Sequence, residues 1–594
     1  MVVAIHLGTY SCARWQHTYA RVRLSNLDGP TMTAVVRMWY LARVAWLFPV
    51  WAALAVLLVG WGLLVRRVLV RVGGGAFNGS LSAFQTLWLG YAGLLGCLLL
   101  ASLAVAVDRV VLTIAWLPAL AGFALERTAV VRRIRQVTRR PRIAIVLGGV
   151  VLVTVFACAW AASDEVIWYD TGLYHLQAVQ WNTTHAAVPG LANLHARLGY
   201  DNSVHVFAAL VDSLWRGMSV HATNGFLLAI VLVQWVVEIV MARTPRGRIR
   251  QAYCLVTLPL FLGKLWTPEV ASLSTDLPLA VVGAVLVLEL LTMPRGRGLL
   301  LGVLVLSLAA VATTTKLGGL AFFVVVAIAM LWRVRGHIRR AQLTVFAVPA
   351  FVLTAWTARN VIVSGWLVFP VFGKLGLPWA VRSKTAHEHL RWIESWARIR
   401  GKHPSEVLDH GFFHWFVVWF DAFRTSREVM LLLASVPLAI ARFLRDAATS
   451  AVSRLGESAA IVACVVALLQ WFVGAPDVRF GGFLFWLLPA VLLAPVLARS
   501  LRKPELRPIV FALVIALAGW NDGLSPRLGR PPSLFGRLPE PGAAATRVVP
   551  AGPETELLVP ATGDQCWNAG LLCTPEPRHQ MFRDPHDVGA GFEP

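Results

Sequence analysis

One short segment of the sequence concentrates side chains that can move protons. Residues 163–181, SDEVIWYDTGLYHLQAVQW, directly follow an apolar run and carry Asp164, Glu165, Asp170, His175 and Gln177. A carboxylate held beside a substrate hydroxyl can act as a general base. Asp170, Asp164 and Glu165 are therefore the candidate carboxylates, and His175 and Gln177 are candidates for binding a substrate beside them. A solvated acidic loop is the simpler interpretation of the same three acids.

More polar side chains of complementary charge follow in the same segment. The stretch AVPGLANLHARLGYDNS places His195, Arg197, Asp201 and Asn202 close together along the chain. Polar groups near a bilayer are costly unless they line a cavity or pair with one another. This concentration therefore indicates a binding cavity. We expect His195 and Arg197 to contribute to it.

Three basic residues elsewhere could bind an anionic group. Arg359 lies in TARNVIVSGW, Arg479 in PDVRF and Lys316 in ATTTKLGG. A guanidinium offers two parallel N–H donors to a phosphate. Each Arg could equally extend its charged head from a span toward the interface. An intramembrane Lys such as Lys316 is usually functional.

Other motifs favour structural interpretations. Asp276 in SLSTDLP precedes an apolar run and is predicted to be a helix N-cap. His175, His185 and His195 recur every ten residues, which is not a spacing for zinc ligands, so no metal site is predicted. No Walker loop, GxSxG or HExxH motif is present, which argues against an ATPase, a serine hydrolase and a zinc protease.

Composition identifies the class of protein. Of the 594 residues, 57% are hydrophobic and only 14% are charged, far from the balance of soluble proteins. The net charge of +23 comes mostly from Arg in short segments between apolar runs, which is typical of cytoplasmic loops and not of nucleic-acid binding. We predict an all-α integral membrane protein in a bacterial cytoplasmic membrane, in contact with lipids and not with nucleic acid.

Apolar segments recur along most of the chain and predict a polytopic bundle of about 12–14 transmembrane helices. The segments are 43–65, 85–107, 110–125, 143–162, 222–242, 252–266, 277–293, 298–314, 317–332, 341–357, 428–443, 458–473, 483–498 and 508–520. Two others, 204–217 and 411–424, are ambiguous, and the Trp- and Phe-rich second one is expected in the membrane interface.

Basic clusters orient the bundle and divide the chain. They alternate between spans so that 163–203, 358–410 and the tail should face outward. Residues 1–37 resemble neither a span nor a domain, and Met32 or Met38 is an equally sensible start. Residues 38–520 form the predicted membrane domain, and 521–594 the predicted extracytoplasmic tail. Within the tail, Cys566 and Cys573 favour a small disulfide loop, with two free thiols as the alternative.

Several of these stretches together resemble known membrane proteins. YDTGLYHLQAVQW, SLSTDLP, ARNVIVSGWLVFP, PDVRF and GDQCWNAGLLCTP are similar to a bacterial family of multispanning proteins without an assigned function, over about residues 40–580. An Asp shortly before Tyr-His in the first large outer loop also resembles GT-C-type glycosyltransferases. That resemblance implies a GT-C-like bundle in which Asp170 is the catalytic carboxylate that acts on an acceptor hydroxyl, with Asp164 or Glu165 as the alternative. It also implies that Arg359, Arg479 and Lys316 hold a lipid phosphate.

The resemblance leads to a functional hypothesis with two rivals. It implies transfer of a sugar from a polyprenyl-phosphate donor to a glycan or glycolipid acceptor during cell-envelope assembly. It names no cofactor, although a divalent cation is used by some enzymes of this type. The rivals are a non-enzymatic transporter or flippase of lipid-linked glycans and an O-antigen-type polymerase or ligase. A transporter should show broken helices in corresponding halves, and no such symmetry is visible in the sequence.

Overall fold

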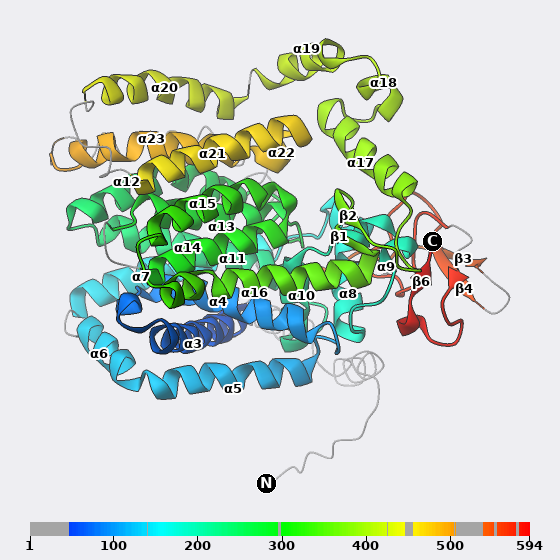
Figure 1. Cartoon of the computed structure of the whole chain (residues 1–594), viewed down its shortest axis with the longest axis horizontal. Helices are drawn as coiled ribbons and strands as arrows, with labels where there is room; N and C mark the ends of the chain where they lie inside the picture. The colour runs from blue at the N-terminus through cyan, green and yellow to red at the C-terminus, as the bar shows by residue number, and fades with distance from the viewer. Residues whose placement is uncertain are drawn as a thin grey trace, which may run out of the picture.

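The computed structural model describes residues 45, 47–138, 141–294, 299–424, 426–445, 455–503, 505, 538–551, 555–577 and 581–594. The N-terminal extension 1–37 and the apolar segment 508–520 lie outside these residues. The described chain is a bundle of helices with a small, mostly extended C-terminal segment at one end (Figure 1).

The helices follow one another along almost the whole described chain. In order they are α3 (Leu47–Gly73), α4 (Ala83–Ala101), α5 (Arg109–Leu125), α6 (Arg127–Thr138), α7 (Pro141–Ala162), α8 (Leu176–Thr184), α9 (Leu191–Leu194), α10 (Ser203–Leu214), α11 (Ser219–Val240), α12 (Pro245–Lys264), α13 (Asp276–Leu291), α14 (Leu299–Thr315), α15 (Leu320–Val334), α16 (Arg339–Ser364), α17 (Ser383–Arg398), α18 (Pro404–Leu408), α19 (Phe412–Phe423), α20 (Arg427–Arg445), α21 (Leu455–Gly474), α22 (Val478–Gly481) and α23 (Leu484–Ser500).

Eight helices in the described part of the chain are long and apolar enough to cross a membrane, which makes this a multi-pass membrane protein. They are Leu47–Phe77, Ala83–Ala101, Ala144–Ala162, Ser219–Val240, Leu317–Val334, Arg339–Ser364, Leu455–Gly474 and Val478–Ser500. A ninth arises if α5 and the start of α6, which meet at 74°, count as one broken span.

The expected number of 12–14 spans is therefore too high for the described residues. Apart from 508–520, each apolar segment does coincide with a helix. However, α13 and α14 have only 16 and 17 residues, and the first turns of α12 carry Arg246, Arg248 and Arg250. Apolar character alone predicted these helices correctly, but it overstated how many of them satisfy the length of a bilayer span.

The centre of the bundle is formed by α13 and α14. Every residue of both helices is buried, including polar ones such as Asp276, Glu289 and Ser307. A helix that is apolar on all sides needs neighbours on all sides. These two helices therefore form the core around which the longer helices pack.

Glycines set the close packing of α3 against α4. A Cβ atom on Gly62 would lie 1.8 Å from the backbone oxygen of Thr86, and one on Gly90 would lie 1.8 Å from that of Leu58. Small residues allow helix backbones to approach in this way inside membranes. The packing fixes the first two spans, and the carbonyl of Ser102, at the end of α4, accepts from the N–H of Ala187 in the segment after α7.

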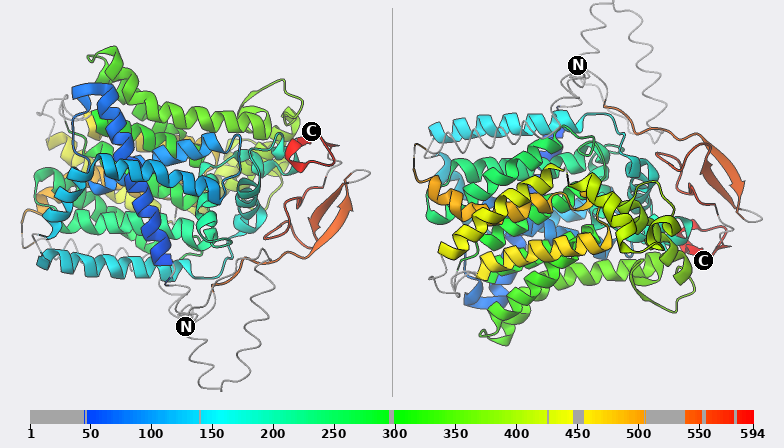
Figure 2. Two further views of the ribbon diagram at one scale, coloured as in Figure 1. Left: turned by 90° about the horizontal axis from the view of Figure 1, so that it is seen from below. Right: turned by 90° about the horizontal axis from the view of Figure 1, so that it is seen from above.

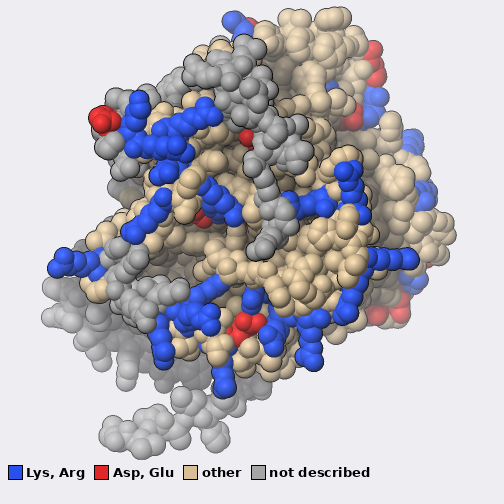
Figure 3. All heavy atoms as spheres, turned by 60° about the vertical axis from the view of Figure 1, so that its left-hand side comes forward, with Lys and Arg blue, Asp and Glu red and all other residues tan. Residues whose placement is uncertain are grey.

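The two ends of the bundle differ in charge and structure. The basic end carries α6 and the last turns of α3, α15 and α23, where Arg71, Arg333 and Arg499 lie. Figure 3 shows Lys and Arg side chains gathered on the left-hand side of the view in Figure 1, with few acids among them. The opposite end, called here the site end, carries residues 163–203 and the C-terminal strands.

Three short hairpins lie at the site end. Strands β1 (Trp366–Val368) and β2 (Phe372–Lys374) pair antiparallel directly after α16. In the C-terminal segment, β3 (Thr546–Pro550) pairs with β4 (Glu556–Pro560), and β5 (Met581–Phe582) pairs with β6 (Phe592–Glu593). Figure 2 shows this segment at one end of the bundle in both further views.

Candidate functional site

The predicted catalytic Asp170 lies at the start of an unusual helical turn. Residues Thr171–His175 form a π-helical turn that continues into α8, and the N–H of Leu176 donates to the carbonyl of Thr171. Such turns are rare and are frequent at functional sites. The hydroxyl of Thr171 accepts from the N–H of Leu273 (3.2 Å), which ties the turn to the segment preceding α13.

Two arginines pair with Asp170. Arg197, in the 3-10 helix Ala196–Tyr200, donates from Nη1 to Oδ1 over 3.3 Å. Arg479, in α22, donates from Nη2 to Oδ2. The structure thus brings together three residues that the sequence predicted for the site, although 309 positions separate Asp170 from Arg479.

A second carboxylate, that of Asp276, extends the group. Its Oδ2 accepts from Nε of Arg479 (3.0 Å), and its Oδ1 accepts from Nζ of Lys316. The prediction that Asp276 caps a helix is wrong, because Thr275 occupies the N-cap and Asp276 is the first residue of α13. Local sequence could not distinguish the two roles, since both place an acid before an apolar helix.

The cationic side chains of this group face outward. The group is called here the ion cluster and consists of Arg197, Asp170, Arg479, Asp276 and Lys316. The exposed fractions of the three basic side chains are 35%, 24% and 25%, against 14% for Asp170 and 5% for Asp276. Three cations against two carboxylates leave one net positive charge. The acids therefore hold the cations in place while the cationic groups remain accessible to an anion.

Aromatic rings and a capping residue fix Arg479 and Lys316. The Arg479 guanidinium lies 4.8 Å from the ring of Trp168, and Nζ of Lys316 lies 3.9 Å from the ring of Phe480. Asp477 caps α22 by accepting the N–H of Arg479 (2.8 Å), and Arg400 donates to both carboxylate oxygens of Asp477. Arg400 thus holds the cap that aims Arg479, a role that sequence reasoning missed.

Arg359, also predicted to bind phosphate, belongs to a separate buried group. Its Nε donates to Asp201 (2.9 Å), Nη1 to Ser102 (2.7 Å) and Nη2 to Asn182 (3.0 Å). Both Arg359 and Asp201 are about 5% exposed or less. With a partner for each arm, Arg359 links α16 to the end of α4, to α8 and to Asp201, and these bonds occupy its guanidinium although the residue lines the pocket described next.

A small pocket lies between this group and the ion cluster. It is lined by Tyr174, Ala178, Trp181, Asn182, Ala186, Ala187, Val188, Leu191, Arg197, Leu198, Asp201, Asn202, His205, Arg359 and Val363. Arg197 therefore faces the pocket and also pairs with Asp170. Trp181 lines the pocket, and its buried Nε1 has no hydrogen-bond partner among the described residues.

The predicted histidines lie beside the cluster as neutral, buried rings. The ring of His175 lies 4.8 Å from that of His205. Burial, reinforced by the nearby cations, lowers the pKa of His175 well below its usual value. Burial and the charge of Arg197 lower the pKa of His195 to about 3. Neither ring adds charge near neutral pH, so the histidines shape the site and do not bind anions electrostatically.

The remaining predicted residues take other places. Asp164 accepts from the N–H of Glu165 (2.9 Å), and Glu165 is exposed. Neither belongs to the ion cluster, whose second acid is Asp276. Gln177 is buried and donates to the carbonyls of Ala569 (3.0 Å) and Trp567 (3.4 Å). Gln177 therefore contacts the C-terminal segment.

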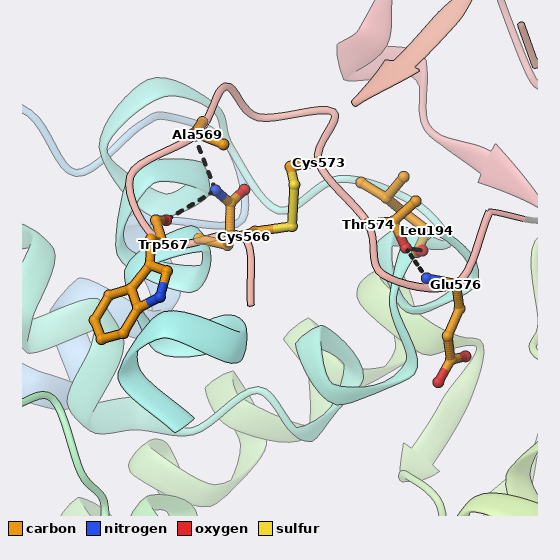
Figure 4. Close-up of a disulfide and its surroundings, with 8 residues drawn as sticks. Leu194, Cys566, Trp567, Ala569, Cys573, Thr574 and Glu576 are labelled. Atoms are coloured by element: carbon orange, nitrogen blue, oxygen red, sulfur yellow. Dashed lines mark hydrogen bonds between the residues drawn. A yellow bond between two sulfur atoms is a disulfide. The ribbon is translucent and has the colours of Figure 1, made fainter. Parts of the chain in front are cut away.

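The C-terminal cysteines are joined beside the site. Cys566 and Cys573 form a disulfide, and both are buried. Figure 4 shows the closed loop with Trp567, Ala569 and Thr574 around it. The hydroxyl of Thr574, directly after the loop, donates to the carbonyl of Leu194 (2.8 Å). The 163–203 segment therefore contacts the loop through Gln177 and the residue that follows the loop through Leu194.

The comparison with protein families decides the membership of the chain. A family model described as Domain of unknown function (DUF8201) matches residues 45–486. The chain belongs to this family. No curated protein and no solved structure matches it. The matched part contains all five residues of the ion cluster.

The arrangement suits an anion better than a metal ion. Both carboxylates of the cluster accept from cationic side chains, so neither is presented to a divalent cation. Within the described residues, no group of three or more His, Cys, Asp or Glu side chains could hold a metal. A phosphate could bind the exposed faces of Arg197, Arg479 and Lys316, because charge-assisted hydrogen bonds to guanidinium and ammonium groups are strong.

Proposed function

We propose that the protein is a membrane glycosyltransferase with a GT-C-like bundle. It transfers a sugar from a polyprenyl-phosphate donor at the outer face of the bacterial cytoplasmic membrane, during assembly of a cell-envelope glycan or glycolipid. The observation that carries the proposal is the ion cluster, in which two carboxylates and three accessible cations meet at one end of a membrane bundle. A lipid-linked substrate would reach that end from the bilayer.

Each residue of the cluster has a role in this reaction. Arg197, Arg479 and Lys316 bind the donor phosphate and stabilise its charge as it leaves. The phosphate competes with Asp170 for the two guanidinium groups, which releases the carboxylate. The acceptor oxygen then bonds to the anomeric carbon while the bond from that carbon to the phosphate oxygen breaks. The acceptor proton passes to Asp170, and polyprenyl phosphate departs.

Substitution of Asp170 tests this proposal. Asp170→Asn retains the shape of the side chain but cannot accept the proton, and removal of a positioned base typically costs about 10²–10⁴ in rate. Glycan or glycolipid output should fall accordingly in a strain that lacks the native gene and carries the variant at equal membrane abundance. Asp164→Asn is the matched control, and its output should stay near that of the unmodified protein.

The second candidate is an O-antigen-type polymerase or ligase, favoured by the pairing of Asp170 with two arginines. Such an enzyme would rely on the cations to hold a lipid diphosphate and would tolerate loss of the carboxylate. An Asp170→Asn strain with normal output, together with an Arg479→Ala strain without output, would favour this candidate and overturn the role of Asp170 as base.

A further inference from the structure

The segment closed by the disulfide packs directly on the turn that follows Asp170. The N–H of Trp567 donates to the carbonyl of Gly172 over 2.7 Å. A Cβ atom on Gly172 would lie 2.4 Å from Cε2 of Trp567, so the indole fits only against a glycine. Trp567 itself has a positive φ of 45°. Gly172 belongs to the π-helical turn and lies two residues after Asp170, so the contact is made close to the catalytic candidate.

Polar contacts extend along the same face. Gln177 and Gln180 of α8 donate to the segment, the latter to Asn568 over 2.6 Å. In the other direction, Gln565 donates to the carbonyl of Tyr169 (2.8 Å), and the Tyr169 hydroxyl donates to Asp564. The segment 564–574 therefore contacts residues on both sides of Asp170.

We infer that the disulfide-closed segment 564–574 positions Asp170, so that the ion cluster is assembled only after Cys566 and Cys573 are joined. The two cysteines are seven positions apart, and their bond closes the loop that carries Trp567. Without it the segment gains conformational freedom, which opposes the single geometry that fits Gly172. The functional weight of this inference rests on the proposed role of Asp170.

The bond itself requires a reaction partner of defined chemistry. Two thiols lose two protons and two electrons as the sulfur atoms join, and a thiol–disulfide oxidant accepts the electrons and becomes a dithiol. Such oxidants act outside the cytoplasm. The protein would therefore complete its site only after the C-terminal segment has reached that compartment.

Hydrogen exchange of the full-length protein in nanodiscs tests the inference without an activity assay. In Cys566→Ser/Cys573→Ser, amide exchange in residues 169–181 should become at least about tenfold faster, a factor that corresponds to about 1.4 kcal/mol of local stability. The thermal unfolding midpoint of the bundle should stay unchanged, which separates local positioning from general stabilisation. Unchanged exchange in residues 169–181 would overturn the inference.

A pair of substitutions tests the contact even if the cysteine variant fails to accumulate. Gly172→Ala should displace the indole and speed exchange in residues 169–181. Trp567→Ala should also speed it, but Gly172→Ala should add little in that background, because the ring that clashes is gone. Gly149→Ala is the control, since a Cβ there has open space. Fully additive effects of the two substitutions would contradict the proposed contact.

The outcome is independent of the outcome for the proposed function. If the segment positions residues 169–181 but Asp170→Asn leaves glycan output intact, the function is wrong and the positioning stands. If Asp170→Asn abolishes output while the cysteine variant retains both normal exchange and normal output, the positioning is wrong and the function stands.

Discussion

Arg479 and Asp276 are joined by a hydrogen bond of 3.0 Å between Nε and Oδ2, which links the start of α22 to the first residue of α13. The same guanidinium also donates to Asp170 through Nη2. Of the three cations in the ion cluster, Arg479 is the one that contacts both carboxylates. Its planar shape makes this possible, because separate N–H groups of a guanidinium point in different directions.

The first prediction concerns that geometry. Arg479→Lys keeps the charge, but the lysine side chain is shorter and carries a single ammonium group. It cannot bridge Asp170 and Asp276 as the guanidinium does. Glycan or glycolipid output should fall about tenfold or more. Arg391→Lys is the matched control, because the Arg391–Asp409 pair is exposed and should matter little. Output at the native level in Arg479→Lys would show that bridging is not required.

The sequence predicted some residues of this site but not which of them form ion pairs. Asp170 and Arg479 stood out because charged residues next to apolar helices are costly and need a reason. No local pattern shows that residues 309 positions apart will pair, since that depends on which helices become neighbours. Asp276 was expected to be an N-cap because Ser-Thr-Asp precedes an apolar run. An acid that forms an ion pair at the start of a helix has the same local pattern. Its partner Lys316 could have indicated the correct role, since a cation within a membrane span requires an acidic partner.

The second prediction concerns Arg359, which the sequence analysis named as a phosphate-binding candidate together with Arg479. Arg359→Met should destabilise the protein by roughly 3–5 kcal/mol, because it leaves Asp201 buried without its cation. Arg359→Met combined with Asp201→Asn should lose less than the sum of the single losses. Thermal unfolding in nanodiscs measures both effects. A stable Arg359→Met protein with impaired output would instead return Arg359 to the substrate-binding residues.

Helix positions were predictable where function was not. Apolar runs predicted the helices because a bilayer demands internal hydrogen bonding of the backbone over a span. The two cysteines of the tail indicated a disulfide loop, and they gave no sign that Trp567 contacts Gly172. That contact depends on backbone groups and on the missing side chain of a glycine, neither of which leaves a periodic pattern in the sequence.

The third prediction concerns acid. His195 is buried with a pKa of about 3, whereas an exposed histidine titrates near 6.5. Between these values the unfolded segment binds a proton that the folded segment does not, so stability falls as pH decreases below about 6.5. At pH 5.5 the loss from this group should be about 1.4 kcal/mol. His195→Gln should remove that part of the pH dependence.

Hydrogen exchange of residues 186–203 at pH 7.5 and 5.5, corrected for the intrinsic rate at each pH, measures this effect. His185→Gln is the control, because His185 is less buried than His195. Equal protection at both pH values in the unmodified protein would contradict the assignment of His195 as a neutral, buried group.

The last prediction is the sidedness of the bundle, which two independent features indicate. Basic side chains gather at the end that carries α6, and such residues are retained in the cytoplasm. The disulfide lies at the opposite end, and disulfides persist outside the cytoplasm. In a Cys12→Ser/Cys97→Ser background, an impermeant maleimide should label Glu165→Cys in intact cells and Gly336→Cys only after permeabilisation. Both positions are exposed, so access to the reagent decides the result. The reverse pattern would place the ion cluster in the cytoplasm and exclude an outward-facing transferase.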